Sequence, residues 1–169
     1  RVRLADGRRL AEDDVAWLPP LEPRTCFALG LNYADHATEL DFKPPAQPLV
    51  FMKGPQAFTG HRAHTRRPAN AAYMHYECEL AVVIGRHGRA IPRAEAYAYV
   101  AGYTVANDYA VRDYLENYYR PNLRVKNRDG ATPLGPWLVD AADVPTPMNL
   151  ELRTWVNGDL AQSGSTRDM

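Results

Sequence analysis

Residues 76–85 read YECELAVVIG, and this stretch is predicted to be a strand on which two carboxylates point the same way. Side chains alternate between the two faces of a strand, so Glu77 and Glu79 share one face, roughly 7 Å apart. Two like charges this close repel unless a positive group lies between them. A hard divalent cation such as Mg²⁺ or Mn²⁺ meets that need, because such ions prefer oxygen ligands.

The burial of this strand decides between a metal site and a solvated edge. The apolar run at residues 80–84 is typical of a central strand. In such a strand, unpaired carboxylates would cost several kcal/mol or become neutral. The alternative is an edge strand with Glu77 and Glu79 in water. The pattern alone weighs the two interpretations equally.

The bulk composition indicates one soluble globular domain rich in loops and strands. The chain has 169 residues, enough for a real core, and 46% of them are hydrophobic. Fourteen prolines and 11 glycines favour many turns. Lys and Arg together number 20, as do Asp and Glu, so net charge gives no reason to expect nucleic acid or an anionic membrane as partner.

Other features of the sequence bear on the compartment. No apolar run reaches a transmembrane length, and no secretory segment is recognisable. Cys26 and Cys78 sit in apolar runs and are expected to be buried, free thiols, which favours the cytoplasm. The chain opens on Arg1 and closes on Met169, so we expect residues to be missing at both ends, and more of them at the C-terminus.

The pattern of apolar and turn residues predicts a series of short elements. Asp-Gly and Asn-Gly pairs predict two hairpins, and continuous apolar runs predict buried strands. The expected elements are a hairpin in 1–10, strands at 25–31 and 49–53, a helix at 92–100, a strand at 101–108, an amphipathic helix at 109–119, and a hairpin at 149–163.

Two further sites carry residues suited to chemistry. His36 and Glu39 are three residues apart on a short predicted helix, where the carboxylate can orient the imidazole as a general base. A solvated surface pair is the alternative. Asp108 ends the strand at 101–108, which we expect to neighbour the 76–85 strand after a helix-containing crossover. It is predicted to be a third oxygen ligand, a helix N-cap, or both.

Several of these residues occur in an order and spacing that resembles the fumarylacetoacetate hydrolase family. The matching pieces are GLNY at 30–33 with His36 and Glu39, Pro48 with Lys53, YECEL at 76–80, ND at 107–108 with RD at 112–113, and Lys126 with Asp129 and GPW at 135–137. The resemblance runs from about Phe27 to the end of the chain. HYECE at 75–79 and NYYRPNL at 117–123 look most like the branch of homoprotocatechuate-pathway isomerase/decarboxylases.

This resemblance implies a fold and an assembly. The fold is mixed and mainly β, with an incomplete β-barrel and short helices, and the family is usually dimeric. We expect an N-terminal hairpin and linker at 1–24 and a metal-dependent catalytic domain at 25–169. The family carries a further loop beyond the segment TRDM at 166–169, so the domain is expected to be truncated at its C-terminus. A homodimer or a fusion to a sister domain is expected.

The resemblance also implies the site. Mg²⁺ or Mn²⁺ is held by three carboxylates, which fall on Glu77, Glu79 and Asp108. A His-Glu pair on a lid helix matches His36 and Glu39. A lysine that neutralises a substrate oxygen matches Lys126. Arg112, Tyr118 and Arg120 are expected either to contact the substrate's second carboxylate or to support the residues that line the site.

The predicted activity is a Mg²⁺-dependent isomerase/decarboxylase of 2-oxo and 2-hydroxy heptenedioates, working through a metal-stabilised enolate. Within the family, a C–C hydrolase of acylpyruvate or fumarylacetoacetate type and an oxaloacetate decarboxylase are the alternatives. A catalytically silent, oligomerising β-domain is the alternative of a different class. The complete set of three carboxylates argues against that last interpretation.

Overall fold

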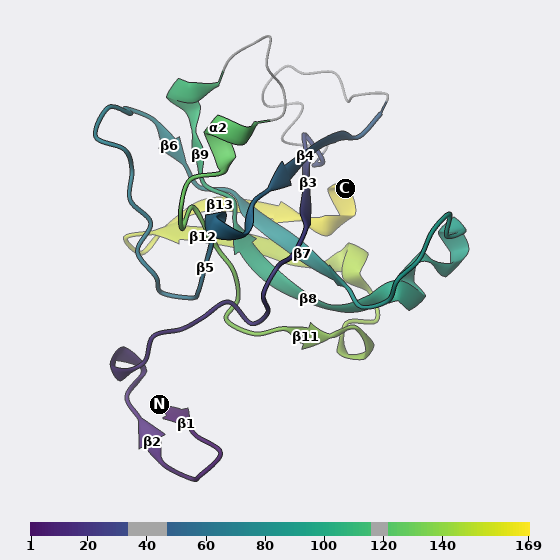
Figure 1. The fold of residues 1–169 in the computed structure, drawn as a ribbon, viewed down its shortest axis with the longest axis horizontal. Helices are drawn as coiled ribbons and strands as arrows, with labels where there is room; N and C mark the ends of the chain where they lie inside the picture. Colours follow the sequence, from purple (N-terminus) through teal and green to yellow (C-terminus); the bar gives the residue numbers. More distant parts are fainter. Residues whose placement is uncertain (34–46, 116–121) are drawn as a thin grey trace.

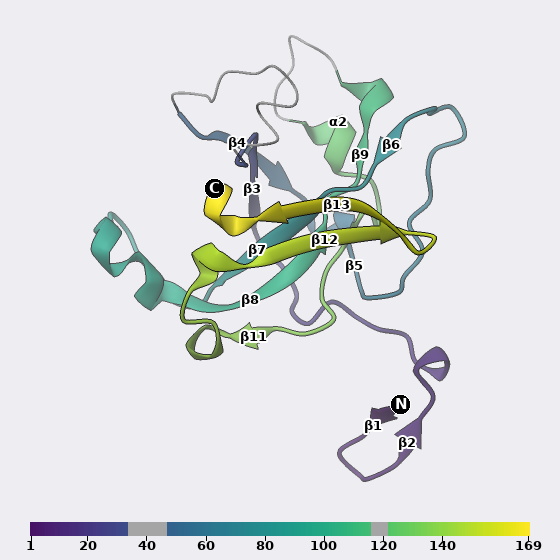
Figure 2. The same ribbon diagram turned by 180° about the vertical axis from the view of Figure 1, so that it is seen from behind.

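The computed structural model describes residues 1–33, 47–115 and 122–169. These parts are built mainly from short β-strands with small helical turns between them (Figures 1 and 2). The strands are β1 (Val2–Arg3), β2 (Arg9–Leu10), β3 (Cys26–Gly30), β4 (Leu49–Lys53), β5 (Phe58–Thr59), β6 (Met74–His75), β7 (Cys78–Ile84), β8 (Val100–Asn107), β9 (Ala110–Val111), β10 (Thr132–Pro133), β11 (Val139–Asp140), β12 (Glu151–Val156) and β13 (Asp159–Ser165). The helical elements are the α-helix α2 (Leu123–Lys126) and the 3-10 turns η1 (Glu12–Asp14), η2 (Pro55–Ala57), η3 (Arg93–Tyr99), η4 (Arg112–Tyr114), η5 (Ala141–Asp143), η6 (Pro147–Asn149) and η7 (Thr166–Asp168).

The longest strands, β7 and β8, pair antiparallel and form the framework of the site. Their register places Cys78 opposite Asn107 and Val82 opposite Tyr103, and β11 pairs with the other edge of β8. The expected neighbourhood of the two strands is confirmed, but the expected crossover is wrong. The connection contains only the 3-10 turn η3, and the Gly85 N–H donates to the Tyr99 carbonyl at 2.8 Å, so the chain turns straight back.

Two further hairpins flank this framework. β3 pairs antiparallel with β4, and β12 pairs antiparallel with β13. The tip of the second hairpin is the predicted Asn157-Gly158 turn, where both residues have positive φ, 53° and 95°. A two-residue hairpin turn that matches the twist of its strands needs positive φ at both positions, which Asn and Gly adopt most readily. The prediction of these strands and of this turn is confirmed.

The amphipathic helix predicted at 109–119 is not formed in its described part. Ala110 and Val111 instead form β9, which pairs antiparallel with β6, and η4 follows. Both β9 residues are fully or almost fully buried, and the next N–H, of Arg112, donates to the Tyr73 carbonyl at 2.9 Å. Tertiary pairing of this short segment therefore outweighs its helical pattern. Asp108 consequently caps no helix, and the remainder of the predicted helix, 116–119, lies outside the described residues.

The fold class is mixed and mainly β, as predicted, and the described strands close into no barrel. They form small sheets, of which β11-β8-β7 has three strands and the others two. The buried apolar side chains are spread along β4, β8, β9 and α2 and the loops that join them. Polar side chains are buried among them, including two lysines and an aspartate. The interior therefore holds a charged cluster that must be paired.

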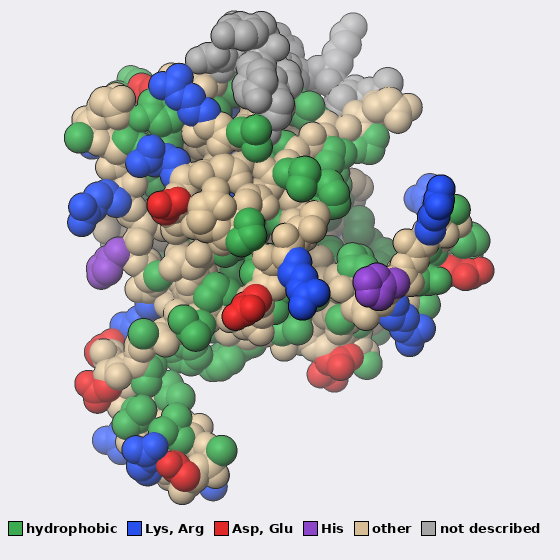
Figure 3. Space-filling model, in the orientation of Figure 1, with side chains coloured by type: hydrophobic (Ala, Val, Ile, Leu, Met, Phe, Trp, Pro, Cys, Tyr) green, Lys and Arg blue, Asp and Glu red, His purple; other side chains and the backbone are tan. Residues whose placement is uncertain are grey.

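One face of the β3–β4 hairpin carries exposed apolar side chains. Phe27 lies opposite Met52 and Leu29 lies opposite Val50, and all four are between 48% and 65% exposed. In the space-filling view, hydrophobic side chains gather where Figure 1 places this hairpin, while charged groups of both signs are scattered elsewhere on the same face (Figure 3).

The N-terminal segment runs away from the body of the molecule (Figure 1). It contacts the body through the aromatic ring of Trp17. Trp17 meets His61 and Trp137 edge-on, with ring centroids 5.5 Å and 5.2 Å apart. The backbone of Trp17 also lies against Gly60, and a Cβ at that position would collide with the Trp17 carbonyl oxygen. In the described parts of the chain, every helix is too short or too polar to cross a membrane.

Candidate active site

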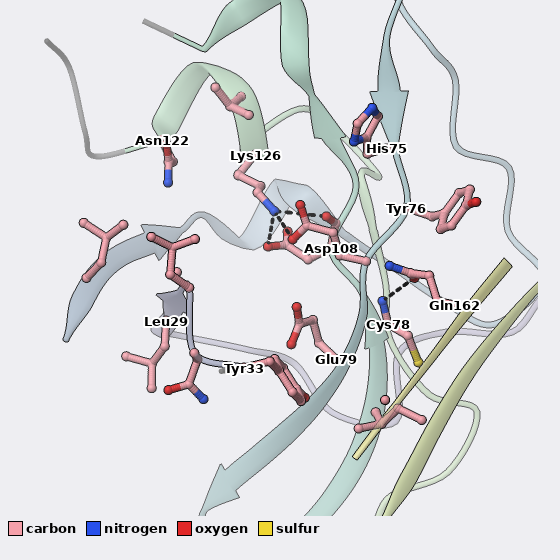
Figure 4. Close-up of a pocket in the computed structure, with 18 of the residues that line it drawn as sticks. Leu29, Tyr33, His75, Tyr76, Cys78, Glu79, Asp108, Asn122, Lys126 and Gln162 are labelled. Atoms are coloured by element: carbon pink, nitrogen blue, oxygen red, sulfur yellow. Dashed lines mark hydrogen bonds and ion pairs between the residues drawn. The ribbon is translucent and has the colours of Figure 1, made fainter. Parts of the chain in front are cut away.

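A cavity of about 520 Å³ lies where the ends of several elements meet (Figure 4). Strand β3 and the residues after it form one side, β7 and the loop before it another, and α2 and β13 complete the wall. The polar side chains that line the cavity come from Asn32, Tyr33, His75, Tyr76, Glu77, Cys78, Glu79, Asp108, Arg112, Asn122, Lys126, Gln162, Ser163 and Asp168. The cavity therefore gathers acidic, basic and amide groups in one place.

The backbone of β7 and β8 fixes two of the three predicted carboxylates side by side. The Asp108 N–H donates to the Glu77 carbonyl at 2.9 Å, and the Glu77 N–H donates to the Asn107 side-chain oxygen at 3.1 Å. These bonds continue the β7–β8 ladder one residue beyond the strands. Glu77 and Asp108 are thus held on the same rim of the cavity.

Two buried lysines converge on these carboxylates. The Lys126 ammonium lies 2.5 Å from Glu77 Oε2 and 2.8 Å from Asp108 Oδ2, so it bridges the two acids (Figure 4). The Lys53 ammonium pairs with Asp108 Oδ1 and donates to the Lys126 main-chain carbonyl at 2.8 Å. The side chains of the two lysines are only 3% and 7% exposed. Charges this deeply buried persist only when they are paired and hydrogen-bonded.

Arg112 completes the pairing of Glu77. Its Nη2 lies 3.0 Å from Glu77 Oε1, so each Glu77 oxygen has a cationic partner. Sequence reasoning predicted Arg112 either as a substrate contact or as a support for the residues of the site. The contact that the structure describes is with Glu77, so the position of that carboxylate depends on Arg112.

Glu79 is in a different electrostatic position from Glu77. The described residues contain no cation in an ion pair with Glu79. Burial, followed by the nearby charges of Glu77 and Asp108, raises the pKa of Glu79 to about 7. Tyr33 lies beside it (Figure 4), and burial followed by the Glu79 charge raises the pKa of the Tyr33 hydroxyl. Glu79 is therefore a carboxylate in need of a positive partner.

The three predicted ligands can be compared with what a divalent ion requires. Three carboxylates on one cavity supply the hard oxygen donors that Mg²⁺ and Mn²⁺ prefer. In the parts of the chain that the structure describes, no three acidic, His or Cys side chains are arranged as a ready metal group. The Lys126 ammonium instead bridges Glu77 and Asp108. The oxygen donors suit Mg²⁺ or Mn²⁺, and Glu79 has no ion-pair partner among the described residues. The assignment of Glu77, Glu79 and Asp108 as ligands stays a prediction.

The question of a central or an edge strand has a mixed answer. β7 is the outer strand of β11-β8-β7 among the described strands, as the edge interpretation required. The Glu77 side chain is nevertheless only 19% exposed, because it faces the cavity and its cations rather than open water. An outer strand can therefore carry a carboxylate that is largely shielded from water.

The predicted catalytic residues divide into those that can be placed and those that cannot. Lys126 lies in the cavity, as its predicted role requires, and that role stays a prediction. The predictions for His36, Glu39, Tyr118 and Arg120 fall outside the described residues.

Sequence reasoning missed two residues of the site. Lys53 appeared only as part of a spacing motif, and Gln162 only as part of a return strand. A lysine at the end of an apolar strand was an available signal for Lys53, since such a residue needs a buried partner. We see no comparable local signal for Gln162.

Comparison with known proteins gives a consistent set of similarities. Residues 25–169 match the family model described as fumarylacetoacetate (FAA) hydrolase C-terminal. A 4-hydroxyphenylacetate degradation bifunctional isomerase/decarboxylase of Salmonella dublin is 61% identical over 166 residues, which are 95% of this chain and 38% of that protein. A homoprotocatechuate catabolism bifunctional isomerase/decarboxylase of Escherichia coli is 62% identical over 145 residues, 86% of this chain and 34% of that protein.

Solved structures show the same likeness. The crystal structure of a 5-carboxymethyl-2-hydroxymuconate delta-isomerase from Mycobacterium smegmatis aligns with a TM-score of 0.79 and 38% identity. The alignment covers 96% of this chain and 63% of that one. The chain thus spans a little over a third of the length of the two curated relatives and under two thirds of this structural one.

Proposed function

Since the chain belongs to the fumarylacetoacetate hydrolase family, we propose that it carries the site of a Mg²⁺-dependent isomerase/decarboxylase of homoprotocatechuate catabolism. Its substrates would be 2-oxo and 2-hydroxy heptenedioates. The observation that carries the proposal is the cavity in which three carboxylates meet buried cations. The 61% identity to a bifunctional isomerase/decarboxylase supports the choice of reaction.

The charges of the cavity support an anionic substrate. The acidic side chains that line it are Glu77, Glu79, Asp108 and Asp168, and the cations beside them are Lys53, Lys126 and Arg112. A divalent cation bound here would outweigh the remaining negative charge of the ionised set. An anionic substrate and the metal ion would therefore favour each other's binding.

The metal ion would be held by Glu77, Glu79 and Asp108. When bound, it supplies a Lewis acid that stabilises negative charge on the 2-oxo oxygen of the substrate. Glu79 would gain most from such an ion, because burial and the charges of Glu77 and Asp108 raise its pKa and a bound cation would oppose them. Mn²⁺ has the same donor preference and is expected to substitute for Mg²⁺.

The protein's own groups have separate tasks in this proposal. Lys53 and Arg112 hold Asp108 and Glu77 in place through ion pairs. The Lys126 ammonium supplies positive charge at the rim and offers a donor to a substrate oxygen. His36, oriented by Glu39, takes a proton from one substrate carbon and returns it to another, or activates water if the substrate is to be hydrolysed. These last roles rest on the family resemblance.

Assembly and location belong to the same proposal. We expect a homodimer or a fusion to a sister domain, and the exposed apolar face of the β3–β4 hairpin accords with a covered surface. A cytoplasmic enzyme is expected, and the free thiols of Cys26 and Cys78 accord with a reducing compartment. Both thiols are half-buried rather than fully buried as predicted. The division into 1–24 and 25–169 also stays a prediction.

An ultraviolet assay tests the reaction. A 2-hydroxyhepta-2,4-dienedioate and its carboxylated precursor are each offered with Mg²⁺ and with chelator, and turnover is expected only with Mg²⁺. Glu77→Gln is expected to lower turnover by about 100-fold or more, on the scale of removing a group that stabilises developing charge. Glu95→Gln is the matched control, because Glu95 is exposed in η3, outside the cavity.

The outcomes separate the parts of the proposal. Near-normal turnover by Glu77→Gln at saturating Mg²⁺ would show that Glu77 is not a ligand. Turnover of oxaloacetate or an acylpyruvate in preference to both heptenedioates would move the enzyme to another branch of the family. His36→Ala is expected to keep metal affinity, measured by calorimetry, and to lose rate.

A further inference from the structure

Gln162 of β13 reaches across to the edge of β7 and is fixed there by its side-chain oxygen. Its Oε1 accepts from the Cys78 N–H at 3.2 Å and from the Thr154 hydroxyl at 3.0 Å. A backbone N–H can only donate, so the atom facing Cys78 must be the oxygen of the amide. The orientation of the whole amide group is therefore determined, and its nitrogen is the other end.

The amide nitrogen of Gln162 is turned toward the cavity. Gln162 lines that cavity, and Figure 4 shows its nitrogen on the side that faces Asp108. This nitrogen carries two N–H donors. Among the hydrogen bonds between described residues, none is donated by it. The side-chain N–H groups of Gln162 are thus held in place by the bonds of its Oε1 and are available to a molecule bound in the cavity.

Lys126 and Arg112, the cationic side chains that line the cavity in the described parts of the chain, are already paired. The Lys126 ammonium lies between Glu77 and Asp108, and Arg112 donates to Glu77. An anionic substrate therefore meets cations whose charge is largely neutralised by neighbouring carboxylates. A neutral donor without a carboxylate partner suits a substrate oxygen better, because it gains a charge-assisted hydrogen bond and loses no existing one.

We propose that Gln162 is a substrate-contact residue whose amide nitrogen donates to a carboxylate oxygen of the dicarboxylate substrate. This inference rests on the function proposed above and adds a specificity determinant to the same site. The bonds of Oε1 to the Cys78 N–H and the Thr154 hydroxyl hold the donor in place. Because that anchor joins β7 to the β12–β13 hairpin, the contact also depends on the packing of these two elements.

The test is Gln162→Glu in the intact protein. The new carboxylate keeps an oxygen for the Cys78 N–H and the Thr154 hydroxyl, but it replaces the donor by a negative group facing the substrate. KM for the dienedioate is expected to rise about 10- to 100-fold, the scale of one charge-assisted hydrogen bond, with a smaller change in kcat. Gln56→Glu is the matched control, since Gln56 is exposed in η2 and makes the same chemical change elsewhere.

A second variant separates contact from folding. Gln162→Met removes the donor without adding charge, so its rise in KM should be smaller than that of Gln162→Glu. Mg²⁺ affinity by calorimetry and the melting temperature are measured for both. A rise in KM with both of these retained supports the contact. An unchanged KM, or a rise that only follows lost metal affinity or lost folding, overturns it.

The same assay distinguishes failure of the proposed function from failure of the Gln162 assignment. If the unaltered protein turns over neither heptenedioate, the proposed function fails, and the substrate contact fails with it. If the unaltered protein is active and Gln162→Glu has the same KM, only the assignment of Gln162 is wrong.

Discussion

The two ends of β7 contrast sharply in what they bury. Immediately before its first residue, Glu77 is 19% exposed in its side chain and contacts the ammonium of Lys126 and the guanidinium of Arg112. At its end, Val82 is 49% exposed and Ile84 is 63% exposed. The charged end is thus the more buried one, which is the reverse of what side-chain hydrophobicity alone predicts.

The contrast has a simple cause. Burial of a charge is tolerated where opposite charges and hydrogen bonds surround it, and the cavity end supplies both. The far end lies at the outer edge of β11-β8-β7, and Val82 and Ile84 are exposed there. A run of apolar residues therefore predicts that a segment forms a strand. Which of its residues are buried depends on the elements that pack against that strand.

The largest effect should come from removing the shared carboxylate at the charged end. Asp108→Asn leaves the ammonium groups of Lys53 and Lys126 buried with less negative charge between them. Breaking a buried pair in this way is expected to lower the free energy of unfolding by about 3–5 kcal/mol, measured by urea denaturation. Asp6→Asn is the control, since Asp6 forms an exposed pair with Arg8, where about 0.5 kcal/mol is expected. Equal effects at the two sites would erase the contrast.

A pH effect of roughly 3–4 kcal/mol is expected from Glu79 in chelator-treated protein. Its pKa rises from 4.5 to about 7 on folding. Below pH 4.5 both states hold the proton. Between pH 4.5 and about 7 only the folded state keeps it, so the free energy of unfolding falls across this range and levels off above it.

Glu79→Gln checks that assignment. The variant should lose this part of the pH dependence and be more stable than the unaltered protein at pH 8, by urea denaturation at stepped pH. Glu95→Gln, an exposed control, should keep the slope. A slope that survives Glu79→Gln would place the titration on another group.

A smaller loss is expected from Arg112→Met, which removes one of the two cations of Glu77. The Arg112 guanidinium is 31% exposed in its side chain and lies 3.0 Å from Glu77. Its loss should lower the free energy of unfolding by about 1–2 kcal/mol, because Lys126 still pairs with the carboxylate. Arg153→Met removes an exposed pair with Glu151 and should cost less than half as much. The reverse order would mean that Glu77 does not need Arg112.

The smallest effect belongs to the apolar end of β7. Ile84→Thr keeps a β-branched side chain at an exposed position, so the free energy of unfolding should change by less than about 0.5 kcal/mol. Val111→Thr, at a position only 2% exposed, should cost at least about 2 kcal/mol because it buries a hydroxyl. A comparable loss at Ile84 would show that another surface covers this end in solution, and size-exclusion chromatography would reveal a second copy.

Local sequence signals predicted the parts of the fold that local physics decides. The Asn157-Gly158 turn and its strands follow from alternation and from backbone conformations that few residues adopt. The neighbourhood of the strands at 76–85 and 101–108 was predicted, together with their carboxylates. Asp108 lies beside Glu77 because the two strands are antiparallel, and the predicted crossover did not contain that pairing.

Long-range contacts decided the parts that sequence reasoning missed. The segment containing Val111 has a helical pattern, but pairing with β6 makes it a strand. Lys53 and Lys126 meet Asp108 across 55 and 18 residues of chain. Gln162 reaches Cys78 across 84 residues. Contacts of such separation depend on how hairpins pack, which no short window of sequence contains.

The close approach of Trp17 to Gly60 has a consequence for anyone who redesigns this protein. The carbonyl of Trp17 occupies the space that a Cβ would need there. A methyl group at position 60 would therefore push the N-terminal segment around Trp17 away from the body of the molecule. Moving that segment away would separate the indole rings of Trp17 and Trp137, whose centroids lie 5.2 Å apart. A substitution at position 60 is thus expected to release the N-terminal segment, and a change in intrinsic tryptophan fluorescence would detect that release.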